Sequence, residues 1–355
     1  MSDFRVATFA SPGAPPVIQM MDRPRLGRRG ALIAVGACGV SDTDLRDLNG
    51  TPGDEAAGLL EEMGSELTTD SLGNPLKPGV KVLIPSFVPC LRCVVCLHHP
   101  DHALGCLRPI HLRGGWADHV HVDFGEHPGA RLYRLPDDMP LWLASLTAPF
   151  ATAMRALRRA QTAGGFPPGA TVVVHGTGAI ALLAVAAAQE MGAGRIIATG
   201  GPEEPFLRLC RQFGAEATIG ADVPNDTIDI VRETVGGLGA DLIVSHGYAA
   251  TDGLAMLRTG GVCVEMGPGP RPGPSAVPSL VPADIADRDL LLIGSRGHGP
   301  AELPAAIQML HRARGRYPFL KMLTRYPLTA AGVSAAVSEQ AIRPTLVPNA
   351  EIAGP

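Results

Sequence analysis

Long apolar stretches are missing from this sequence, which has no run of eighteen consecutive apolar residues. A helix that spans a membrane needs about 20 such residues, so we expect no membrane-spanning segment and no membrane as a partner. The first residues, MSDFRVATFASPGAPP, lack the charged-then-apolar order of a signal peptide, which leads us to expect a cytoplasmic protein. Neither charge is in large excess, because the formal net charge is −4. The sequence therefore gives no reason to expect nucleic acid as a partner.

The residues that are present are sufficient for two buried cores. Of the 355 residues, 46% are hydrophobic and 18% are charged, which is typical of a globular chain of two domains. Short apolar runs separated by glycine and proline, such as residues 30–38 and 81–86, indicate a strand-rich domain over residues 1–155. Strands and helices then alternate over residues 156–295, which predicts an α/β fold with a doubly wound parallel sheet. The pattern becomes mixed over residues 296–355, so we expect these residues to return to the first domain.

A glycine turn between a strand and a helix carries the signal for a dinucleotide. The turn reads Gly176-Thr-Gly178-Ala-Ile-Ala181 and follows the apolar run TVVVH. Gly176 permits the tight turn, Gly178 lets the backbone approach a pyrophosphate, and Ala181 is small enough for the helix to pack on the strand. The N-terminus of the helix adds unpaired N–H groups for the phosphates. We therefore predict a site for NAD or NADP.

The sequence leaves open which of these two coenzymes binds. An acidic residue usually ends the second strand of such a domain and binds the ribose hydroxyls, but here that strand ends without a carboxylate. This absence removes the usual barrier to a 2′-phosphate. The acidic residues 203–204 would repel such a phosphate, whereas the arginines 208 and 211 would attract it. The further candidates for contact with the coenzyme stand at strand ends and are Thr199, Gly200, Gly201, His175 and His246.

Four of the seven cysteines form a tight cluster, Cys90-x2-Cys93-x2-Cys96-x9-Cys106. Four thiolates on one short loop suit tetrahedral zinc and leave no coordination position open for a substrate. Such a site is structural, and its binding energy orders a lobe, here about residues 86–110, that lacks a core of its own. We therefore predict one structural zinc.

These motifs, in this order, resemble those of the medium-chain dehydrogenase/reductase superfamily, in its zinc-containing alcohol dehydrogenase branch. The segment Ala37-Cys-Gly-Val-Ser-Asp-Thr-Asp-Leu45 is similar to the one that carries the first ligand of the catalytic zinc there. Gly53-Asp-Glu55 is similar to the Gly-His-Glu segment that carries the second ligand. The resemblance covers nearly the whole chain and implies a GroES-like catalytic domain, a Rossmann domain and an NAD(P)-dependent activity. Dimers are common among such relatives, so it also implies a homodimer or homotetramer.

The chain departs from that family at the catalytic zinc. Ser41 stands where the family has a cysteine ligand, and Asp54 stands where it has a histidine ligand. The third ligand normally comes from a segment just before the dinucleotide domain, but residues 143–156 contain no Cys, His, Asp or Glu. We therefore expect the catalytic zinc to be absent.

Three functions remain open for such a chain. The first is hydride transfer without a catalytic zinc to an activated C=C, C=N or C=O bond of a small metabolite, with Ser41 or Thr43 as the proton donor. The second is a non-redox reaction, such as a cyclisation, elimination or isomerisation, with Asp42, Asp54 and Glu55 as acid–base groups. Carboxylates crowded in an apolar cleft have raised pKa values and can serve as general acids. The third is a binding role without catalysis, and in each case the expected partner is a small molecule.

Overall fold

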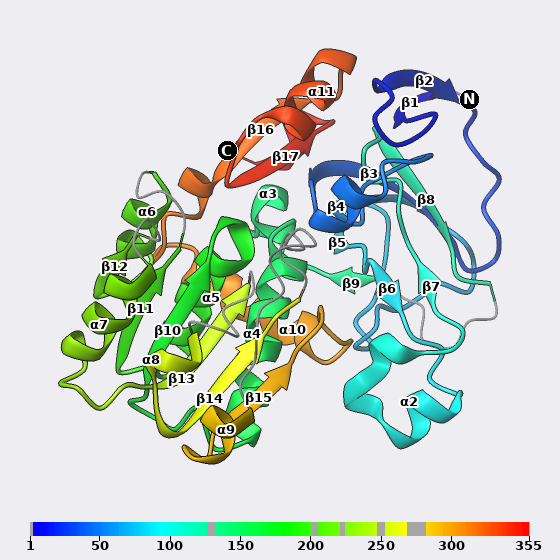
Figure 1. The fold of residues 1–355 in the computed structure, drawn as a ribbon. Coiled ribbons are helices and arrows are strands. Elements are labelled where there is room, and N and C mark those ends of the chain that lie inside the picture. Colours follow the sequence, from blue (N-terminus) through cyan, green and yellow to red (C-terminus); the bar gives the residue numbers. More distant parts are fainter. Residues whose placement is uncertain are drawn as a thin grey trace. The chain divides into compact units, whose positions relative to one another are not determined.

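The computed structural model describes residues 3–125, 132–200, 205–220, 224–246, 253–267 and 282–354. The chain divides into two compact units. Unit 1 comprises Met1–Ala148, Gly299–Arg314 and Met322–Pro355, and unit 2 comprises Pro149–His298 and Gly315–Lys321. The blue N-terminal strands and the red C-terminal strands in Figure 1 therefore belong to the same unit, although most of the chain separates them in sequence.

Unit 1 is built mainly from β-strands. Its strands are β1 (Phe4–Thr8), β2 (Val17–Met21), β3 (Gly30–Gly39), β4 (Glu55–Met63), β5 (Lys81–Leu83), β6 (Phe87–Val88), β7 (Ile110–His111), β8 (His119–Asp123), β9 (Tyr133–Arg134), β16 (Leu323–Pro327) and β17 (Arg343–Val347). Its helices are α1 (Asp42–Arg46), α2 (Val94–His98), α3 (Leu141–Ala144), α10 (Glu302–Ala313), α11 (Ala330–Ser338) and α12 (Ala350–Ala353). The main sheet has the order β16-β17-β3-β4-β5-β9, with β8 paired to β3.

The strand β3 positions the residues of interest in unit 1. All of its residues are buried, as expected for an apolar run that is covered on both faces. It pairs antiparallel with β4, β8 and β17, so the start of β4 and the start of β17 lie beside its end. The end of β3 leads into α1, which brings Ser41 next to Glu55 and Arg343 in the fold.

Unit 2 is a parallel sheet with helices on both faces. Its strands are β10 (Thr171–Gly176), β11 (Arg195–Thr199), β12 (Ala217–Ile219), β13 (Ala240–His246), β14 (Leu257–Glu265) and β15 (Leu291–Gly294). Its helices, the first of which begins at the end of unit 1, are α4 (Thr147–Thr162), α5 (Gly178–Glu190), α6 (Phe206–Gln212), α7 (Pro224–Thr234), α8 (Gly253–Met256) and α9 (Pro282–Ala286). The strand order is β12-β11-β10-β13-β14-β15, and every pair is parallel (Figure 1, green to orange). This order confirms the predicted doubly wound sheet.

Three details bear on the sequence expectations. The sequence of residues 253–261 predicts one helix, but α8 covers only the first 4 of them, and β14 begins directly afterwards at Leu257. The segment Gly315–Lys321 belongs to unit 2 rather than to the returning part of unit 1, since Tyr317 stacks on Phe213 with ring centroids 5.7 Å apart. Within the part of the chain that the structure describes, no helix is long and apolar enough to cross a membrane.

Candidate functional site

The four clustered cysteines converge at one point of unit 1. The sulfur atoms of Cys90, Cys93, Cys96 and Cys106 lie within 4.8 Å of one another. Cys93 Sγ is 3.5 Å from Cys96 Sγ and 3.9 Å from Cys106 Sγ. A tetrahedral zinc with Zn–S bonds of about 2.3 Å separates its sulfurs by about 3.8 Å. The four cysteines therefore lie close enough together to hold a structural zinc.

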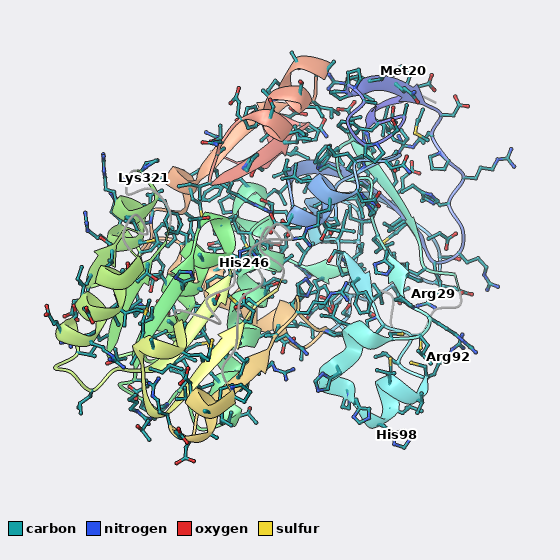
Figure 2. All side chains as sticks on the ribbon, viewed as in Figure 1. Met20, Arg29, Arg92, His98, His246 and Lys321 are labelled. Carbon is teal, nitrogen blue, oxygen red and sulfur yellow. The ribbon has the colours of Figure 1, made fainter. Side chains whose placement is uncertain are left out.

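Backbone N–H groups donate hydrogen bonds to cysteine sulfurs of this loop and so favour their thiolate form. The N–H of Cys90 donates to Cys106 Sγ at 3.2 Å. The N–H groups of Leu107 and Cys96 lower the pKa of Cys93 to about 6. A zinc ligand is a thiolate, so the lowered pKa of Cys93 favours metal binding at neutral pH. Burial and the neighbouring thiols of Cys93 and Cys106 raise the pKa of Cys96 to about 12, so this thiol must lose its proton when the metal binds. The exposed charged side chain of Arg92 points away from the lobe (Figure 2), which leaves its interior to the sulfurs.

The residues at the expected ligand places of a catalytic zinc do not form a second cluster of this kind. Among the described residues, the four cysteines are the only group of three or more Cys, His, Asp or Glu side chains arranged to hold a metal ion. Ser41 is buried, and its Oγ accepts a hydrogen bond from the N–H of Asp44 at 3.0 Å, which caps α1. In the third segment, the hydroxyls of Ser145 and Thr147 donate to backbone carbonyls at 2.8 and 2.7 Å. The hydroxyls of Ser41, Ser145 and Thr147 are therefore hydrogen-bonded to backbone groups of the chain itself.

Asp44 is a buried carboxyl group that is not among the acid–base candidates predicted from the sequence. Its side chain is 0% exposed and accepts a hydrogen bond from the N–H of Gly53 at 2.8 Å. Burial and the nearby charge of Asp54 raise the pKa of Asp44 to about 6, against hydrogen bonds from Gly53 and Ser41 that lower it. Asp44 therefore exchanges a proton close to neutral pH. The signal that could have found it is the Ser-x-x-Asp spacing of a capping box.

A guanidinium from the far end of the chain lies beside these residues. Arg343 begins β17, is buried, and forms an ion pair with Glu55. Its Nη1 also donates to the carbonyl of Val40 at 3.0 Å. Gly39 leaves room for it, because a Cβ there would overlap the guanidinium. No local pattern in the sequence indicates this contact, since 288 residues separate Arg343 from Glu55.

The remaining candidates for acid–base chemistry, Asp42, Thr43 and Asp54, differ in their exposure. Asp54 is half-buried, and its Oδ1 is buried without a hydrogen-bond partner in the described structure. Asp42 and Thr43 are exposed in the first turn of α1, although Asp42 is near enough to Arg343 to interact with its charge. We name the residues that the fold brings together the carboxylate–arginine cluster: Ser41, Asp44, Asp54, Glu55 and Arg343.

The glycine turn of unit 2 lies at the carboxyl ends of its central strands. Gly176 has a φ of +130°, and a Cβ there would lie 2.5 Å from the carbonyl oxygen of His246. Gly178 has a φ of +81°, and nothing would lie within 4 Å of a Cβ there. Ala181 is fully buried in α5. These positions provide the tight turn, the open backbone and the close helix packing that a pyrophosphate site requires, so the residues present fit a dinucleotide.

Other coenzyme candidates surround this turn. Thr199 ends β11, and its Oγ1 is 2.9 Å from His175 Nδ1 on β10. Gly200 has a φ of +128° and packs against the backbone of the turn. His246, labelled in Figure 2, ends β13 and is half-buried. Gly201 lies outside the described residues.

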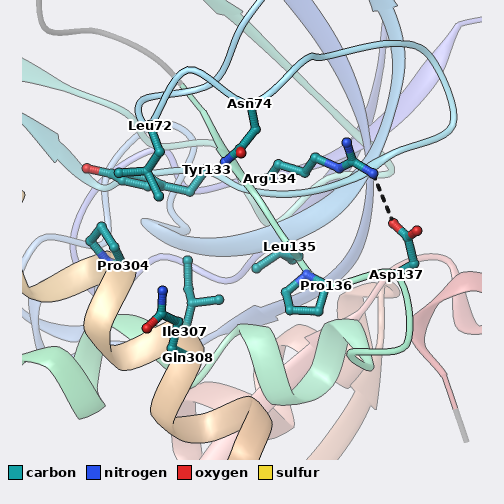
Figure 3. Close-up of a pocket in the computed structure, with 10 residues that line it drawn as sticks. All are labelled: Leu72, Asn74, Tyr133, Arg134, Leu135, Pro136, Asp137, Pro304, Ile307 and Gln308. Carbon is teal, nitrogen blue, oxygen red and sulfur yellow. Dashed lines mark ion pairs between the residues drawn. The ribbon is translucent and has the colours of Figure 1, made fainter.

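A cavity elsewhere in unit 1 contains none of these residues. It has a volume of about 340 Å³ and lies between α10 and the chain around β9 (Figure 3). Tyr133, Leu135 and Ile307 are buried side chains of its lining. At its rim Arg134 Nη2 is 3.5 Å from Asp137 Oδ1, so these two charges pair with each other (Figure 3). Its lining brings together no acid–base pair or nucleophile, and we assign no chemistry to it.

Comparison with known proteins identifies the family. The alcohol dehydrogenase GroES-like domain matches residues 27–135, and the zinc-binding dehydrogenase domain matches residues 179–312. L-threonine 3-dehydrogenase of Bacillus subtilis is 31% identical over 255 residues, which are 67% of this chain and 68% of that protein. 5-exo-hydroxycamphor dehydrogenase of Pseudomonas putida is 30% identical over 319 residues, which are 83% of this chain and 84% of that protein. The crystal structure of an alcohol dehydrogenase from Thermotoga maritima has the same fold, with a TM-score of 0.86, 21% identity, and coverage of 98% of this chain and 100% of that one.

The chain therefore belongs to the zinc-binding dehydrogenases, in the alcohol dehydrogenase-like branch of the medium-chain dehydrogenase/reductase superfamily. This membership confirms the resemblance seen in the sequence and the combination of a GroES-like domain with a Rossmann-type sheet. It also makes the chain an NAD(P)-dependent oxidoreductase of that superfamily.

Proposed function

We propose that this chain transfers hydride, without a catalytic zinc, between a nicotinamide coenzyme and an activated C=C, C=N or C=O bond of a small molecule. The observation that carries the proposal is the donor set at the ligand places in unit 1. A catalytic zinc is held by three side chains of Cys, His or carboxylate type. The chain offers one half-buried carboxylate, Asp54, and one hydroxyl, Ser41, which already accepts the N–H of Asp44.

The glycine turn supports the coenzyme part of the proposal. Gly176, Gly178 and the first turn of α5 would hold the pyrophosphate, because they leave backbone N–H groups at the helix start and no side chain over them. When bound, the coenzyme supplies or accepts the hydride. Ala181 keeps α5 packed on β10 and so keeps the turn in place.

The chain's own carboxyl groups would manage the proton that accompanies the hydride. Without zinc to polarise an oxygen, a general acid must stabilise the charge that develops. Asp44, with its pKa of about 6, can hold a proton near neutral pH. Ser41 Oγ donates a hydrogen bond to Asp44 Oδ2 at 3.1 Å, so a proton can pass between Asp44 and this hydroxyl. Asp54, whose Oδ1 has no partner in the described part of the chain, is the carboxyl group that would meet the substrate.

Metal content is the first test of this proposal. Mass spectrometry of the purified chain should give about one zinc per chain, bound by the four cysteines. The variant Cys93→Ser should lower that value towards zero. A value of about two zinc ions per chain, with the second lost in Asp54→Asn, would contradict the proposal.

Turnover is the second test. Oxidation of NADH or NADPH should be followed with an enal, a para-quinone and a cyclic imine, and compared with oxidation of a secondary alcohol. Asp54→Asn should lower kcat on the accepted compounds about 100-fold, the usual size of a general acid–base contribution. Glu66→Gln, which changes a carboxylate paired with the exposed Arg28 and in contact with none of these residues, should keep the wild-type rate. Rapid alcohol oxidation with none of the three acceptors reduced would refute the proposal.

A non-redox reaction is the second candidate function, and the pairing of Asp44 with Asp54 favours it. The charge of Asp54 helps to raise the pKa of Asp44, so one carboxyl group can hold a proton while the other is ionised. Such a pair can serve as general acid and general base in an isomerisation or elimination. The mass of the product separates the two functions, because hydride transfer with a proton adds two hydrogens to the substrate and an isomerisation adds none.

A further inference from the structure

A row of polar side chains crosses the carboxyl edge of the parallel sheet in unit 2. The strand register places His175 of β10 between Thr199 of β11 and Ser245 of β13. Glu265 of β14 continues the row beside Ser245. Two residues earlier on each strand, the same face carries a buried apolar row: Val173, Ile197, Ile243 and Cys263. On this face of the sheet, the apolar row packs in the core, and the last row carries side chains that can form hydrogen bonds. This last row lies at the edge of the sheet where the dinucleotide would bind.

The residue after Thr199 cannot carry the acidic side chain that usually binds the ribose. Gly200 has a φ of +128°, and a Cβ there would lie 2.8 Å from the carbonyl oxygen of Gly176. An Asp or Glu at the end of the second strand binds the 2′-hydroxyl and repels a 2′-phosphate. In this chain the strand end offers a hydroxyl and a neighbouring imidazole in its place.

The hydroxyl and the imidazole act together. Thr199 Oγ1 is 2.9 Å from His175 Nδ1, and Thr199 is only 1% exposed, so the ring is held by a buried, fixed partner. A protonated imidazole held at Nδ1 can donate from Nε2 to a phosphate oxygen, and such charge-assisted hydrogen bonds are strong. We propose that His175, positioned by Thr199, binds the 2′-phosphate of NADPH and makes this coenzyme preferred over NADH. The inference rests on the coenzyme site of the proposed function.

The charges around His175 decide whether a phosphate is tolerated there. Its register partners on β11 and β13 are uncharged, and the next residue of β13 is His246. Arg208 is exposed on α6, the helix that follows β11. Glu265, the one acidic side chain of the row, is separated from His175 by the whole of β13. Residues 203–204 lie outside the described structure. The described strand partners of His175 therefore carry no negative charge.

Binding of the two coenzymes to the full chain tests the inference without a substrate. Fluorescence titration of the wild type should give a Kd for NADPH at least about tenfold below that for NADH, a difference of about 1.4 kcal/mol. His175→Gln keeps a group that can bond Thr199 but removes the positive charge, and should reduce the preference to about twofold while leaving the Kd for NADH unchanged. Thr199→Val should reduce it in the same direction. His311→Gln, which changes a histidine of α10 in unit 1, is the control and should keep the wild-type ratio.

Smaller probes isolate the phosphate contact. Adenosine 2′,5′-bisphosphate should compete with NADPH more strongly than 5′-AMP, and His175→Gln should remove this difference. Equal wild-type affinities for NADPH and NADH, or a preference that survives His175→Gln, would overturn the inference and leave the proposed function standing. If neither coenzyme binds at millimolar concentration, the coenzyme-dependent proposal itself is refuted.

Discussion

Removal of the buried guanidinium of Arg343 should destabilise unit 1 strongly. Its side chain is 4% exposed and its ion-pair partner Glu55 is 12% exposed, so neither charge is well hydrated. The loss of one partner leaves an uncompensated buried charge, which costs about 3–5 kcal/mol. The carbonyl of Val40 also loses its hydrogen bond of 3.0 Å. We therefore expect Arg343→Met to lower the free energy of unfolding by about 3–5 kcal/mol. For a unit of this size 1 kcal/mol changes Tm by roughly 2–4 °C, so the fall in Tm is roughly 6–20 °C.

Differential scanning calorimetry is the suitable assay, because the two units can unfold in separate transitions. Arg343→Met combined with Glu55→Met removes both charges and should recover part of the loss, since an apolar pair can replace a buried ion pair at little cost. Arg28→Met is the matched control: its ion pair with Glu66 is 81% and 43% exposed, and its loss should cost less than about 1 kcal/mol. The reasoning fails if Arg343→Met lowers Tm no more than Arg28→Met, or if the double variant is less stable than the single one.

Three further predictions concern proton binding, the glycine turn and assembly. The pKa of Asp44 in the folded chain is about 6, above its ordinary 3.8, so the fold favours the protonated form. The free energy of unfolding should therefore fall by about 3 kcal/mol as pH rises from about 4 to 6. Asp44→Asn should flatten this part of the curve of unfolding free energy against pH, and an unchanged slope would contradict the raised pKa. Gly176→Ala places a Cβ 2.5 Å from the carbonyl oxygen of His246, so titration should show coenzyme binding weakened about 100-fold, and wild-type affinity would refute the assigned turn. We expect a homo-oligomer that buries the edge strand β15, where Leu291 is 46% exposed. Leu291→Arg should lower the mass found by sedimentation, and an unchanged mass would exclude β15 as the subunit interface.

Local patterns were sufficient to predict most of the fold. The apolar run at residues 30–38 forms the buried strand β3, because a strand covered on both faces needs apolar side chains at successive positions. The alternation of strands and helices gave the parallel sheet, and the spacing of the cysteines gave four sulfurs within 4.8 Å. Each of these signals lies within a short stretch of chain, so no knowledge of the tertiary structure was needed.

The electrostatics of the candidate site could not be predicted in this way. Arg343 reaches Glu55 only because β17 pairs with the end of β3, and no local pattern reports that pairing. The pKa of Asp44 depends on burial and on Asp54, ten residues further along the chain. The space that Gly200 leaves depends on its left-handed backbone, which the sequence permits but does not require.

The charges of the carboxylate–arginine cluster favour one kind of hydride acceptor. The cluster contains three carboxyl groups and one guanidinium: Asp44, Asp54, Glu55 and Arg343. Arg113 lies 3.8 Å from Asp44 Oδ1, but it pairs with Asp47 at 3.0 Å, so this neighbouring pair adds no net charge. Three carboxylates against one guanidinium leave two net negative charges when all are ionised. Reduction of a neutral ketone builds negative charge on oxygen, which a zinc ion would stabilise and which this cluster opposes. Reduction of an iminium ion removes a positive charge that the cluster attracts.

We therefore expect protonated 1-pyrroline to be reduced with a kcat/KM at least about tenfold above that of cyclopentanone, its neutral ketone counterpart, which corresponds to about 1.4 kcal/mol in the barrier. Asp54→Asn should remove most of this advantage, because it neutralises the carboxylate with the unpartnered oxygen. Glu66→Gln, whose carboxylate pairs with the exposed Arg28 and contacts no residue of the cluster, should leave the ratio unchanged. A ketone reduced as fast as the iminium ion, with a ratio insensitive to Asp54→Asn, would mean that the charge of the cluster does not act on the substrate.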